Sequence, residues 1–360
     1  MPLAPAAFAI PGDLNTRTGG YLYERRLLEE LRVTGRDVAY IPLAAGWPAP
    51  DAALTAEAAA RLGALPADRP LILDGLVFGA IDTDLLAGLA PPVVAMTHHP
   101  LGLEDGLPPE RAAALIAREA ANMRHAAHVV VPSPHTKRTL VARFGVPEDK
   151  ITIALPGFDR PALPDVPRDD PPLILSVGIL CPRKGHDILI EALAQVADLP
   201  WHAIIAGRDH DVGTAARLRA LCADPVLEGR VVLPGSVEDA ALWSLYARAA
   251  VFALATRYEG YGIVFGEALL AGLPIVTCAA GAVPETVPPD TGLLVPPDDA
   301  PAFAAALRRM LTDPALRDGC GRAARAAGAG LPRWSDTAAV MSGVLDRLAA
   351  GQRPKPSNGR

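Results

Sequence analysis

Short apolar segments alternate with longer amphipathic segments along the first half of the chain. The longer segments have the three-to-four-residue spacing of helices, at Tyr21–Arg32, Thr55–Leu62, Pro109–His125 and Pro134–Phe144. The apolar segments are predicted strands, at Ala6–Ile10, Val38–Ile41, Leu71–Leu73, Val93–Met96, Val129–Val131 and Ile151–Ala154. Continuous apolar strands that alternate with helices indicate a parallel sheet covered on both faces.

The alternation stops at residues 156–172 and then restarts. The sequence there, PGFDRPALPDVPRDDPP, is rich in Pro and Asp and has no periodicity, which is typical of a linker. The strands predicted after it are Leu173–Val177, Ala203–Ala206, Val231–Leu233, Val251–Ala255, Ile275–Cys278 and Leu293–Val295. We therefore expect domains at 1–157 and 173–331, a linker at 158–172, a helix at 332–350 and a disordered tail at 351–360.

The composition limits the kinds of partner and compartment. The 360 residues include 34 Lys and Arg against 40 Asp and Glu, a net charge of −6 that argues against nucleic-acid binding. The four cysteines form no C-x-x-C pair, so neither a zinc site nor a disulfide framework is indicated. No apolar segment approaches the ~18 residues of a membrane span, and the apolar start lacks the basic region of a signal peptide. We expect a soluble cytoplasmic protein.

The most informative motif is EGYGIVFGE, residues 259–267, after the predicted strand Val251–Ala255. Ligands of open α/β sheets bind beyond the carboxyl ends of the strands, and a glycine-flanked helix start there offers free N–H groups to a phosphate. Glu267, early in the helix, suits paired ribose hydroxyls, and Glu259 in the turn suits a sugar hydroxyl. The alternative is a strand–turn–helix with two solvated glutamates.

A second motif, SVGILCPRKGHD, follows the first strand of the second domain. Gly178 permits close backbone approach, and Arg183 and Lys184 bring two cations to the carboxyl end of that strand. Such cations can neutralise a diphosphate leaving group when no metal does so. The alternative is a solvated Arg-Lys loop.

Two weaker motifs lie in the first domain. RTGGY places Gly19 and Gly20 at a helix start, without the G-x-G-x-x-G spacing of dinucleotide sites. His98 and His99 follow the strand Val93–Met96, where one of them is expected to enter the site, because neighbours on a strand point to opposite sides. No further histidine or cysteine at metal-ligand spacing accompanies them, so no metal site is predicted.

Together these motifs resemble the retaining, nucleotide-sugar-dependent glycosyltransferases of family 4, which have the GT-B fold. The match is strongest over residues 258–299 and extends from RTGGY to PRWSDTAAV. The resemblance implies an α/β protein of two Rossmann-like α/β/α domains facing across a cleft, with the C-terminal helix crossing back to the first domain.

The resemblance also implies roles for individual residues. Glu259 would contact the donor sugar near the transferred carbon, and Glu267 would bind the donor ribose. Lys184, with Arg183 beside it, would stabilise the leaving diphosphate, and His98 would lie near the sugar. The residues expected to line the donor site besides these are Gly19, Gly20, Gly178, Gly260, Tyr261, Gly262, Ile263 and Val264.

One position departs from the family pattern. Family members often have an arginine directly after the glycine of the SVG segment, and this chain has Ile179 there. Arg183 is the candidate replacement, provided that its side chain points with that of Lys184. Gly281 and Glu285 continue the strongest motif and are assigned to loop structure.

The implied reaction moves a sugar from a UDP- or GDP-sugar to a small molecule, lipid or glycan, with retention and without a metal or cofactor. Closure about residues 156–172 would exclude water. Two alternatives share the architecture: a GT-B epimerase or phosphorylase, and a catalytically inactive sugar-nucleotide-binding protein. A dehydrogenase is a third, but no strand here precedes the G-x-G-x-x-G motif that it needs. A periplasmic-type binding protein is a fourth, and it would need a signal peptide.

Weak membrane contact is a further expectation from the resemblance. Arg111, Arg118 and Arg124 lie on one predicted helix and suit anionic lipid. Glu110 and Glu119 on the same helix favour the alternative, a solvated helix face.

Overall fold

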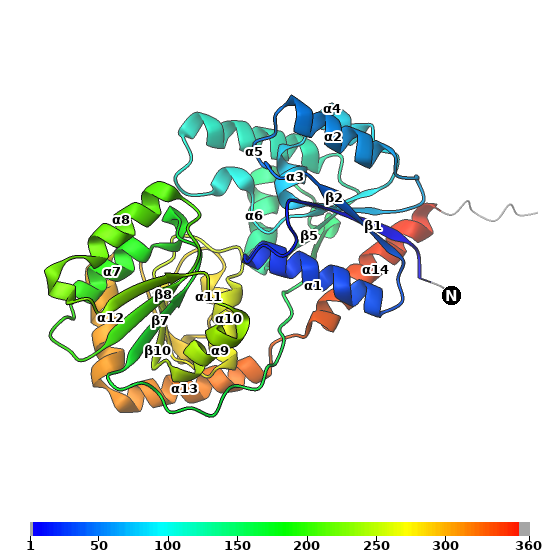
Figure 1. Ribbon diagram of the computed structural model, residues 1–360. Helices are drawn as coiled ribbons and strands as arrows, with labels where there is room; N and C mark the ends of the chain where they lie inside the picture. The colour runs from blue at the N-terminus through cyan, green and yellow to red at the C-terminus, as the bar shows by residue number, and fades with distance from the viewer. Residues whose placement is uncertain (1–2, 353–360) are drawn as a thin grey trace, which may run out of the picture. The chain divides into compact units, whose positions relative to one another are not determined.

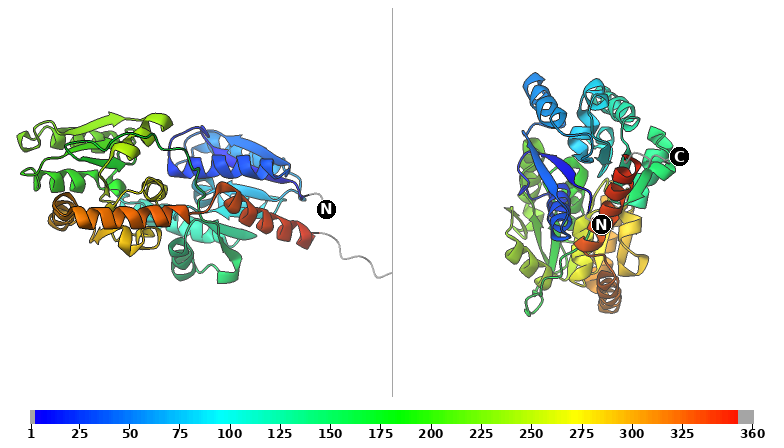
Figure 2. Two further views of the ribbon diagram at one scale, coloured as in Figure 1. Left: turned by 90° about the horizontal axis from the view of Figure 1, so that it is seen from below. Right: turned by 90° about the vertical axis from the view of Figure 1, so that its right-hand side faces the viewer.

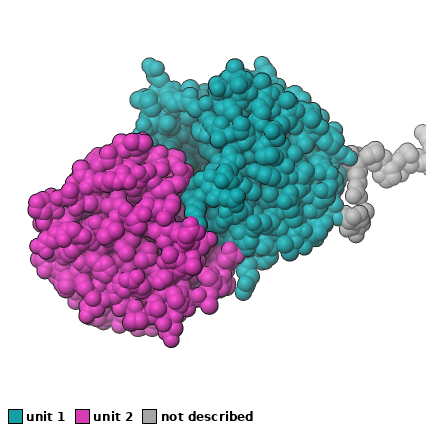
Figure 3. Space-filling view, viewed as in Figure 1, with its two compact units in different colours: residues 1–157, 332–360 teal, residues 158–331 magenta. Residues whose placement is uncertain are grey.

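The computed structural model describes residues 3–352 and divides into two compact units. The first unit comprises residues 1–157 and 332–360, and the second comprises residues 158–331 (Figure 3). Each unit contains one parallel six-stranded sheet with helices packed against it (Figure 1).

The first unit has the strand order β2-β1-β3-β4-β5-β6. The strands are β1 (Ala6–Pro11), β2 (Val38–Leu43), β3 (Leu71–Asp74), β4 (Val93–Met96), β5 (His128–Val131) and β6 (Ile151–Ile153). The helices are α1 (Gly19–Val33), α2 (Ala52–Gly63), α3 (Gly75–Ala80), α4 (Thr83–Ala87), α5 (Pro109–Met123), α6 (Pro134–Phe144) and α14 (Trp334–Gln352). Every predicted strand of this half is confirmed to within a residue or two, whereas α3 and α4 were not predicted because each is too short to show a helical period.

Helix α14 closes the first unit from the far end of the chain. It packs against α1, as Figures 1 and 2 show in several orientations. The rings of Tyr23 and Trp334 meet edge to face with their centroids 5.6 Å apart. Thr337 donates to the carbonyl of Leu155, and the buried guanidinium of Arg36 lies 2.8 Å from a carboxylate oxygen of Asp346. Gly351 and Gln352 still belong to α14, so the helix runs past its predicted end, and the rest of the predicted tail lies outside the described residues.

The second unit has the strand order β12-β11-β10-β7-β8-β9. The strands are β7 (Leu173–Val177), β8 (His202–Ala206), β9 (Val231–Gly235), β10 (Val251–Leu254), β11 (Ile275–Cys278) and β12 (Gly292–Val295). The helices are α7 (His186–Ala194), α8 (Val212–Cys222), α9 (Asp239–Arg248), α10 (Ile263–Leu270), α11 (Val283–Thr286), α12 (Ala300–Thr312) and α13 (Pro314–Ala329).

Strand alternation divides the core of the second unit between two faces of its sheet. In β10, Val251 and Ala253 join one apolar cluster, and Phe252 and Leu254 join the other. The first cluster takes in residues of α7, α8 and α12, and the second takes in residues of α9, α10 and α13. Because both faces are covered, the strands need apolar side chains at every position, which is why they have no polar alternation.

The segment predicted as a linker packs along the second unit. Arg160 donates to carbonyl oxygens near the end of α13, including that of Leu331 at 2.7 Å. Asp169 forms a two-pronged ion pair with Arg248, with N–O distances of 2.8 Å. A segment without periodicity is thus held by side-chain contacts to residues far along the chain, which no local pattern reveals.

The described residues hold no disulfide and no helix suited to spanning a membrane. The four cysteines are free thiols. Within residues 3–352, no helix has both the length and the apolarity needed to cross a membrane.

Candidate functional site

Two neighbouring strands bring the strongest motifs together in the second unit. Strands β7 and β10 pair in parallel, so their carboxyl ends lie at the same edge of the sheet. The chain after β7 carries Arg183 and Lys184, and the chain after β10 carries Glu259. The order of strands therefore brings together residues that are 75 positions apart in the sequence.

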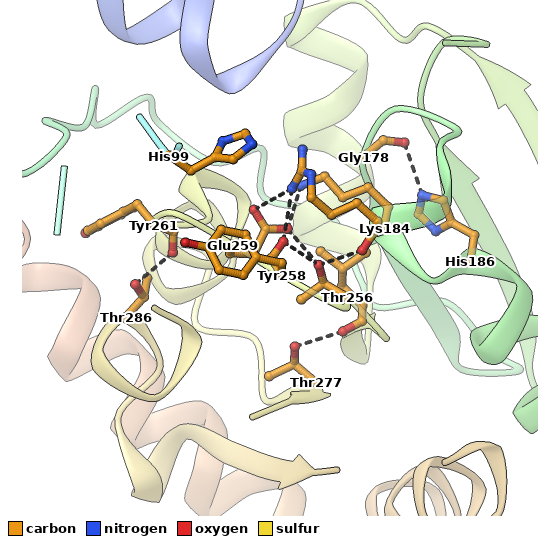
Figure 4. A network of polar contacts seen from close by, with 12 residues as sticks. His99, Gly178, Lys184, His186, Thr256, Tyr258, Glu259, Tyr261, Thr277 and Thr286 are labelled. Carbon is orange, nitrogen blue, oxygen red and sulfur yellow. Dashed lines mark hydrogen bonds and ion pairs between the residues drawn. The ribbon is translucent and has the colours of Figure 1, made fainter. Parts of the chain in front are cut away.

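Glu259 accepts contacts from both cations (Figure 4). Its Oε1 lies 2.7 Å from Nζ of Lys184, and its Oε2 lies 3.3 Å from Nη1 of Arg183. Arg183 also donates to the carbonyl of Tyr258 at 3.0 Å, and the hydroxyl of Thr256 lies 3.0 Å from Oε1 of Glu259. Arg183 thus points with Lys184, as a replacement for an arginine at position 179 requires.

The cluster holds more positive than negative charge. Glu259 and Lys184 are only 4% and 8% exposed. Burial by itself would raise the pKa of Glu259, but the charges of Lys184 and Arg183 outweigh it and lower that pKa below its ordinary value. Glu259 is therefore ionised at neutral pH. One carboxylate faces two cations, which leaves a local excess of one positive charge for an anionic ligand.

Two glycines set the position of Lys184. A Cβ on Gly178 would lie 3.2 Å from Cδ of Lys184, so the lysine stem packs directly over that backbone. Gly185 has φ +61° and begins the turn into α7, and a Cβ there would lie 1.9 Å from the carbonyl oxygen of Ala255. Gly185 therefore permits the close contact between the β7 and β10 loops.

Replacing Gly185 by alanine is expected to destabilise the protein by at least about 2 kcal/mol, because the new Cβ adds a backbone clash to an unfavourable φ. Urea unfolding measures this. The matched control is Gly319→Ala in α13, where a Cβ would meet no atom within 4 Å and alanine is expected to be neutral or slightly stabilising. Equal midpoints for Gly185→Ala and wild type would contradict the packing argument.

The glycine-rich start of α10 carries the rest of the donor-site motif. Gly262 has φ +87° and precedes the first helical residue, Ile263, and no side chain caps this end. Burial raises the pKa of Tyr261 to about 12, so its phenol stays protonated. The N–H groups of this helix start are suited to an anion, as expected of Gly260, Tyr261, Gly262, Ile263 and Val264.

Glu267 lies in α10 and has a partner that the sequence did not reveal. The hydroxyl of Tyr246 donates to its Oε2 at 2.8 Å. Burial raises the pKa of Glu267, and the hydrogen bond from Tyr246 opposes the shift. Because Tyr246 is on α9, a separate helix, only the packing of the two helices brings the pair together.

The first unit holds the other predicted residues. Thr18 caps α1, which begins at Gly19, and a Cβ on Gly20 would lie 3.6 Å from the ring of His98. His98 and His99 lie in a bend after β4, not on the strand, and take different partners: Nε2 of His99 lies 2.6 Å from Glu104, whereas Nε2 of His98 points toward Glu24 at 3.5 Å.

The residues that sequence reasoning missed act through contacts across the fold. Thr256 stands three residues before Glu259 and just ahead of the motif, so its closeness in sequence was a usable signal. Arg257 forms a two-pronged pair with Asp187, with N–O distances of 3.0 and 3.1 Å, and links the two loops. The contact between Arg257 and Asp187 is evident only once the order of strands in the sheet is known.

Two doubly wound units, one with a cationic cluster beside a glycine-rich helix start, define a class of proteins that bind phosphate-bearing ligands beyond the strand ends. Comparison with known families is more specific. Residues 164–327 match the family described as Glycosyl transferases group 1, and residues 23–160 match the family described as Glycosyltransferase Family 4. The chain belongs to the family 4 glycosyltransferases and has their GT-B fold.

Curated relatives and solved structures agree with this assignment. The D-inositol 3-phosphate glycosyltransferase of Kineococcus radiotolerans is 31% identical over 275 residues, 68% of this chain and 62% of the relative. A GDP-mannose-dependent mannosyltransferase of Corynebacterium glutamicum, which acts on monoacylated phosphatidylinositol monomannoside, is 35% identical over 167 residues, 44% of this chain and 42% of the relative. The chain thus spans less than two thirds of the length of these relatives.

Among solved structures, the sucrose-phosphate synthase of Thermosynechococcus elongatus superposes with a TM-score of 0.81 at 24% identity, covering 97% of this chain and 100% of that one. The likeness extends over both units and supports the fold.

Proposed function

We propose that this protein transfers a sugar from a nucleoside-diphosphate sugar to a hydroxyl group of an acceptor, with retention of anomeric configuration. The observation that carries the proposal is the buried cluster in which Lys184 and Arg183 meet on Glu259 beside the uncapped start of α10. It supplies positive charge where a diphosphate would develop negative charge as it leaves.

In this reaction the bond between the anomeric carbon and the diphosphate breaks. The acceptor oxygen forms its bond to the anomeric carbon at the same time or afterwards. Lys184, Arg183 and the N–H groups at the start of α10 would stabilise the departing diphosphate. Glu267 would hold the ribose, since a carboxylate accepts from paired hydroxyls. Glu259 would orient the cations and contact the donor sugar, and the acceptor hydroxyl would pass its proton to the departing diphosphate oxygen as the new bond forms.

Relatives support a nucleotide-sugar donor, because the mannosyltransferase above is GDP-mannose-dependent by name. The uncapped start of α10 offers backbone N–H groups, which bind phosphate whatever base is attached. The site supports a phosphate-bearing donor without selecting the base, so UDP- and GDP-sugars are the candidates to test.

A panel of UDP- and GDP-sugars tests the proposal. One donor is expected to raise the Tm of the protein, since a ligand at about 100 times its Kd stabilises the native state by about 2.7 kcal/mol. With small molecules from cell extracts as acceptors, the same donor is expected to release nucleoside diphosphate and form an axial or equatorial linkage that matches its own anomeric configuration.

Other outcomes contradict the proposal in distinguishable ways. Phosphate-dependent formation of a sugar phosphate would identify a phosphorylase, and conversion to another nucleotide sugar would identify an epimerase. Binding without turnover against every acceptor would identify a sugar-nucleotide-binding protein. Inversion at the anomeric carbon would overturn the stereochemistry alone.

Contacts within the first unit engage the basic side chains of α5, whereas Glu119, which was expected on the same solvated face, is fully buried. Arg118 pairs with Asp82 at 3.0 Å, and Arg111 donates to the carbonyl of Pro48. These side chains are therefore partly engaged, and we expect no sedimentation with anionic vesicles at low salt. Salt-sensitive co-sedimentation would instead support membrane contact.

A further inference from the structure

A buried pair of carboxyl groups lies behind His98 in the first unit. Glu24 projects from α1, and Asp74 ends β3, and the two are 1% and 4% exposed. The charge of Glu24 raises the pKa of Asp74, which favours a proton kept between the two carboxyl groups. The potential ligand atoms of Glu24, Asp74 and His98 all lie within 4.8 Å of one another.

Asp74 serves the backbone as well as the pair. Its Oδ1 accepts from the N–H groups of Leu76 and Val77 at 2.8 and 3.2 Å and caps α3. Burial raises the pKa of Asp74 well above its ordinary value, and burial raises that of Glu24 to about 7. The pair therefore keeps one proton and carries its single negative charge above about pH 7, as Glu24 ionises.

Nε2 of the His98 ring faces the carboxyl pair. Nε2 is fully buried and has no hydrogen-bond partner in residues 3–352, and it lies 3.5 Å from Oε1 of Glu24, which is likewise buried without a partner. The ring keeps 24% of its side-chain surface exposed. Its exposed part therefore lies away from Nε2.

The orientation of the ring is held from two further sides. Tyr23 meets His98 edge to face, with ring centroids 5.2 Å apart, and the backbone of Gly20 packs against Cδ2. Burial lowers the pKa of His98, and the charge of Asp74 opposes that shift. The titratable groups around the ring are thus Glu24 and Tyr23 from α1 and Asp74 from β3, and burial keeps the Tyr23 phenol protonated.

We propose that Glu24 and Asp74 are positioning residues that hold neutral His98 as its Nε2–H tautomer, so that Nδ1 is the atom offered to a hydroxyl group of a bound substrate. A negative charge beside Nε2 favours the proton on that nitrogen, and Nδ1 then keeps its lone pair as an acceptor. The role in turnover rests on the proposed function, but the tautomer itself does not.

Nitrogen-15 NMR of histidine-labelled protein reads the tautomer without any substrate. The His98 signal is assigned by its loss in His98→Gln. In the wild type we expect the Nε2–H pattern. In the double variant Glu24→Gln with Asp74→Asn, which keeps the shapes and the helix cap but removes the charge, we expect a mixture of tautomers and a lower His98 pKa.

Two single variants separate charge from packing. Glu24→Gln removes the carboxylate that faces Nε2 and keeps Asp74, so it should shift the tautomers in the same direction as the double variant and provides a readout if the double variant fails to fold. Asp82→Asn is the control for capping, because Asp82 caps α4 as Asp74 caps α3, and it should leave the His98 signal unchanged.

Turnover gives the second readout once a donor is known. In the double variant we expect kcat to fall about tenfold or more, with a smaller change in donor KM. This pattern is typical of a group whose contact with the substrate matters in the transition state more than in donor binding. An Nδ1–H pattern in the wild type, an unchanged pattern in the double variant, or a stoichiometric metal ion lost in that variant would each overturn the proposal. Lack of turnover in the wild type would count against the proposed function alone.

Discussion

Replacing Lys184 by methionine is expected to lower sugar transfer by about 10²–10³-fold, the usual effect of removing one preorganised group that stabilises developing charge. Methionine keeps the unbranched stem that packs over Gly178 and removes only the ammonium group. The loss should fall on kcat with the donor that shifts Tm, because the diphosphate gains its extra negative charge as the bond breaks.

Lys137→Met is the matched control, since Lys137 is a partly buried lysine of the first unit that pairs with Glu148 at 3.2 Å and does not belong to the Glu259 cluster of the second unit. It should retain wild-type turnover. Turnover by Lys184→Met within a few-fold of wild type, in folded protein, would show that the cluster does not serve the leaving group.

A double-mutant cycle with Glu259→Gln apportions the effect. If Glu259 acts partly by holding Lys184 in place, the double variant should lose less activity than the product of the two single losses. Strict additivity would mean that the 2.7 Å ion pair contributes nothing to the role of the lysine.

The second large effect is a fall in stability as the pH rises, caused by buried Glu119. This side chain of α5 accepts from the N–H of Leu101 at 2.9 Å, while its Oε1 is buried without a partner in residues 3–352. Burial raises its pKa from 4.5 to about 8, and the hydrogen bond from Leu101 opposes this only in part. The folded protein therefore holds this proton through a pH range in which the unfolded chain has lost it.

The sign follows from proton binding. Between about pH 4.5 and 8 the folded state binds more protons at Glu119 than the unfolded state, so the free energy of unfolding falls as the pH rises through that range. The loss is on the order of 5 kcal/mol at this site and levels off above pH 8. Glu24, whose pKa is raised to about 7, adds to the same trend.

Urea unfolding at pH 5, 6.5 and 8 measures this trend. Glu119→Gln should reduce the pH dependence of the unfolding free energy by about one proton. Its stability relative to the wild type should therefore be greater at pH 8 than at pH 5. Glu29→Gln, on the exposed side of α1, should keep the wild-type dependence. A Glu119→Gln variant with the full wild-type slope would show that this carboxyl is ionised in the folded protein.

Much of the fold was predictable because strands buried on both faces are continuous apolar segments. All twelve strands of the two sheets lie where such segments occur, and the break after Gly157 is visible as a change in composition. Helix α3 was missed because its sequence, GLVFGA, is too short to show a helical period and its start depends on Asp74 as a cap.

The residues proposed for chemistry were found by local spacing, and their mutual contacts were not. EGYGIVFGE fixes Glu259 and Glu267 eight positions apart on one turn and helix, so a short-range pattern suffices. The pairing of Tyr246 with Glu267 depends on how α9 and α10 pack, and adjacency of Arg183 and Lys184 in the sequence did not say that both would reach one carboxylate.

By itself, the sequence determined the two α/β halves and the family, because apolar period and glycine spacing are local properties of a chain. The tertiary structure alone decided that Lys184 and Arg183 meet on Glu259, and that the buried carboxyl groups of Glu24 and Asp74 lie together beside His98. Each of these contacts joins segments 50 or more positions apart, and only the order of parallel strands and the burial it creates bring such groups together and shift their charges.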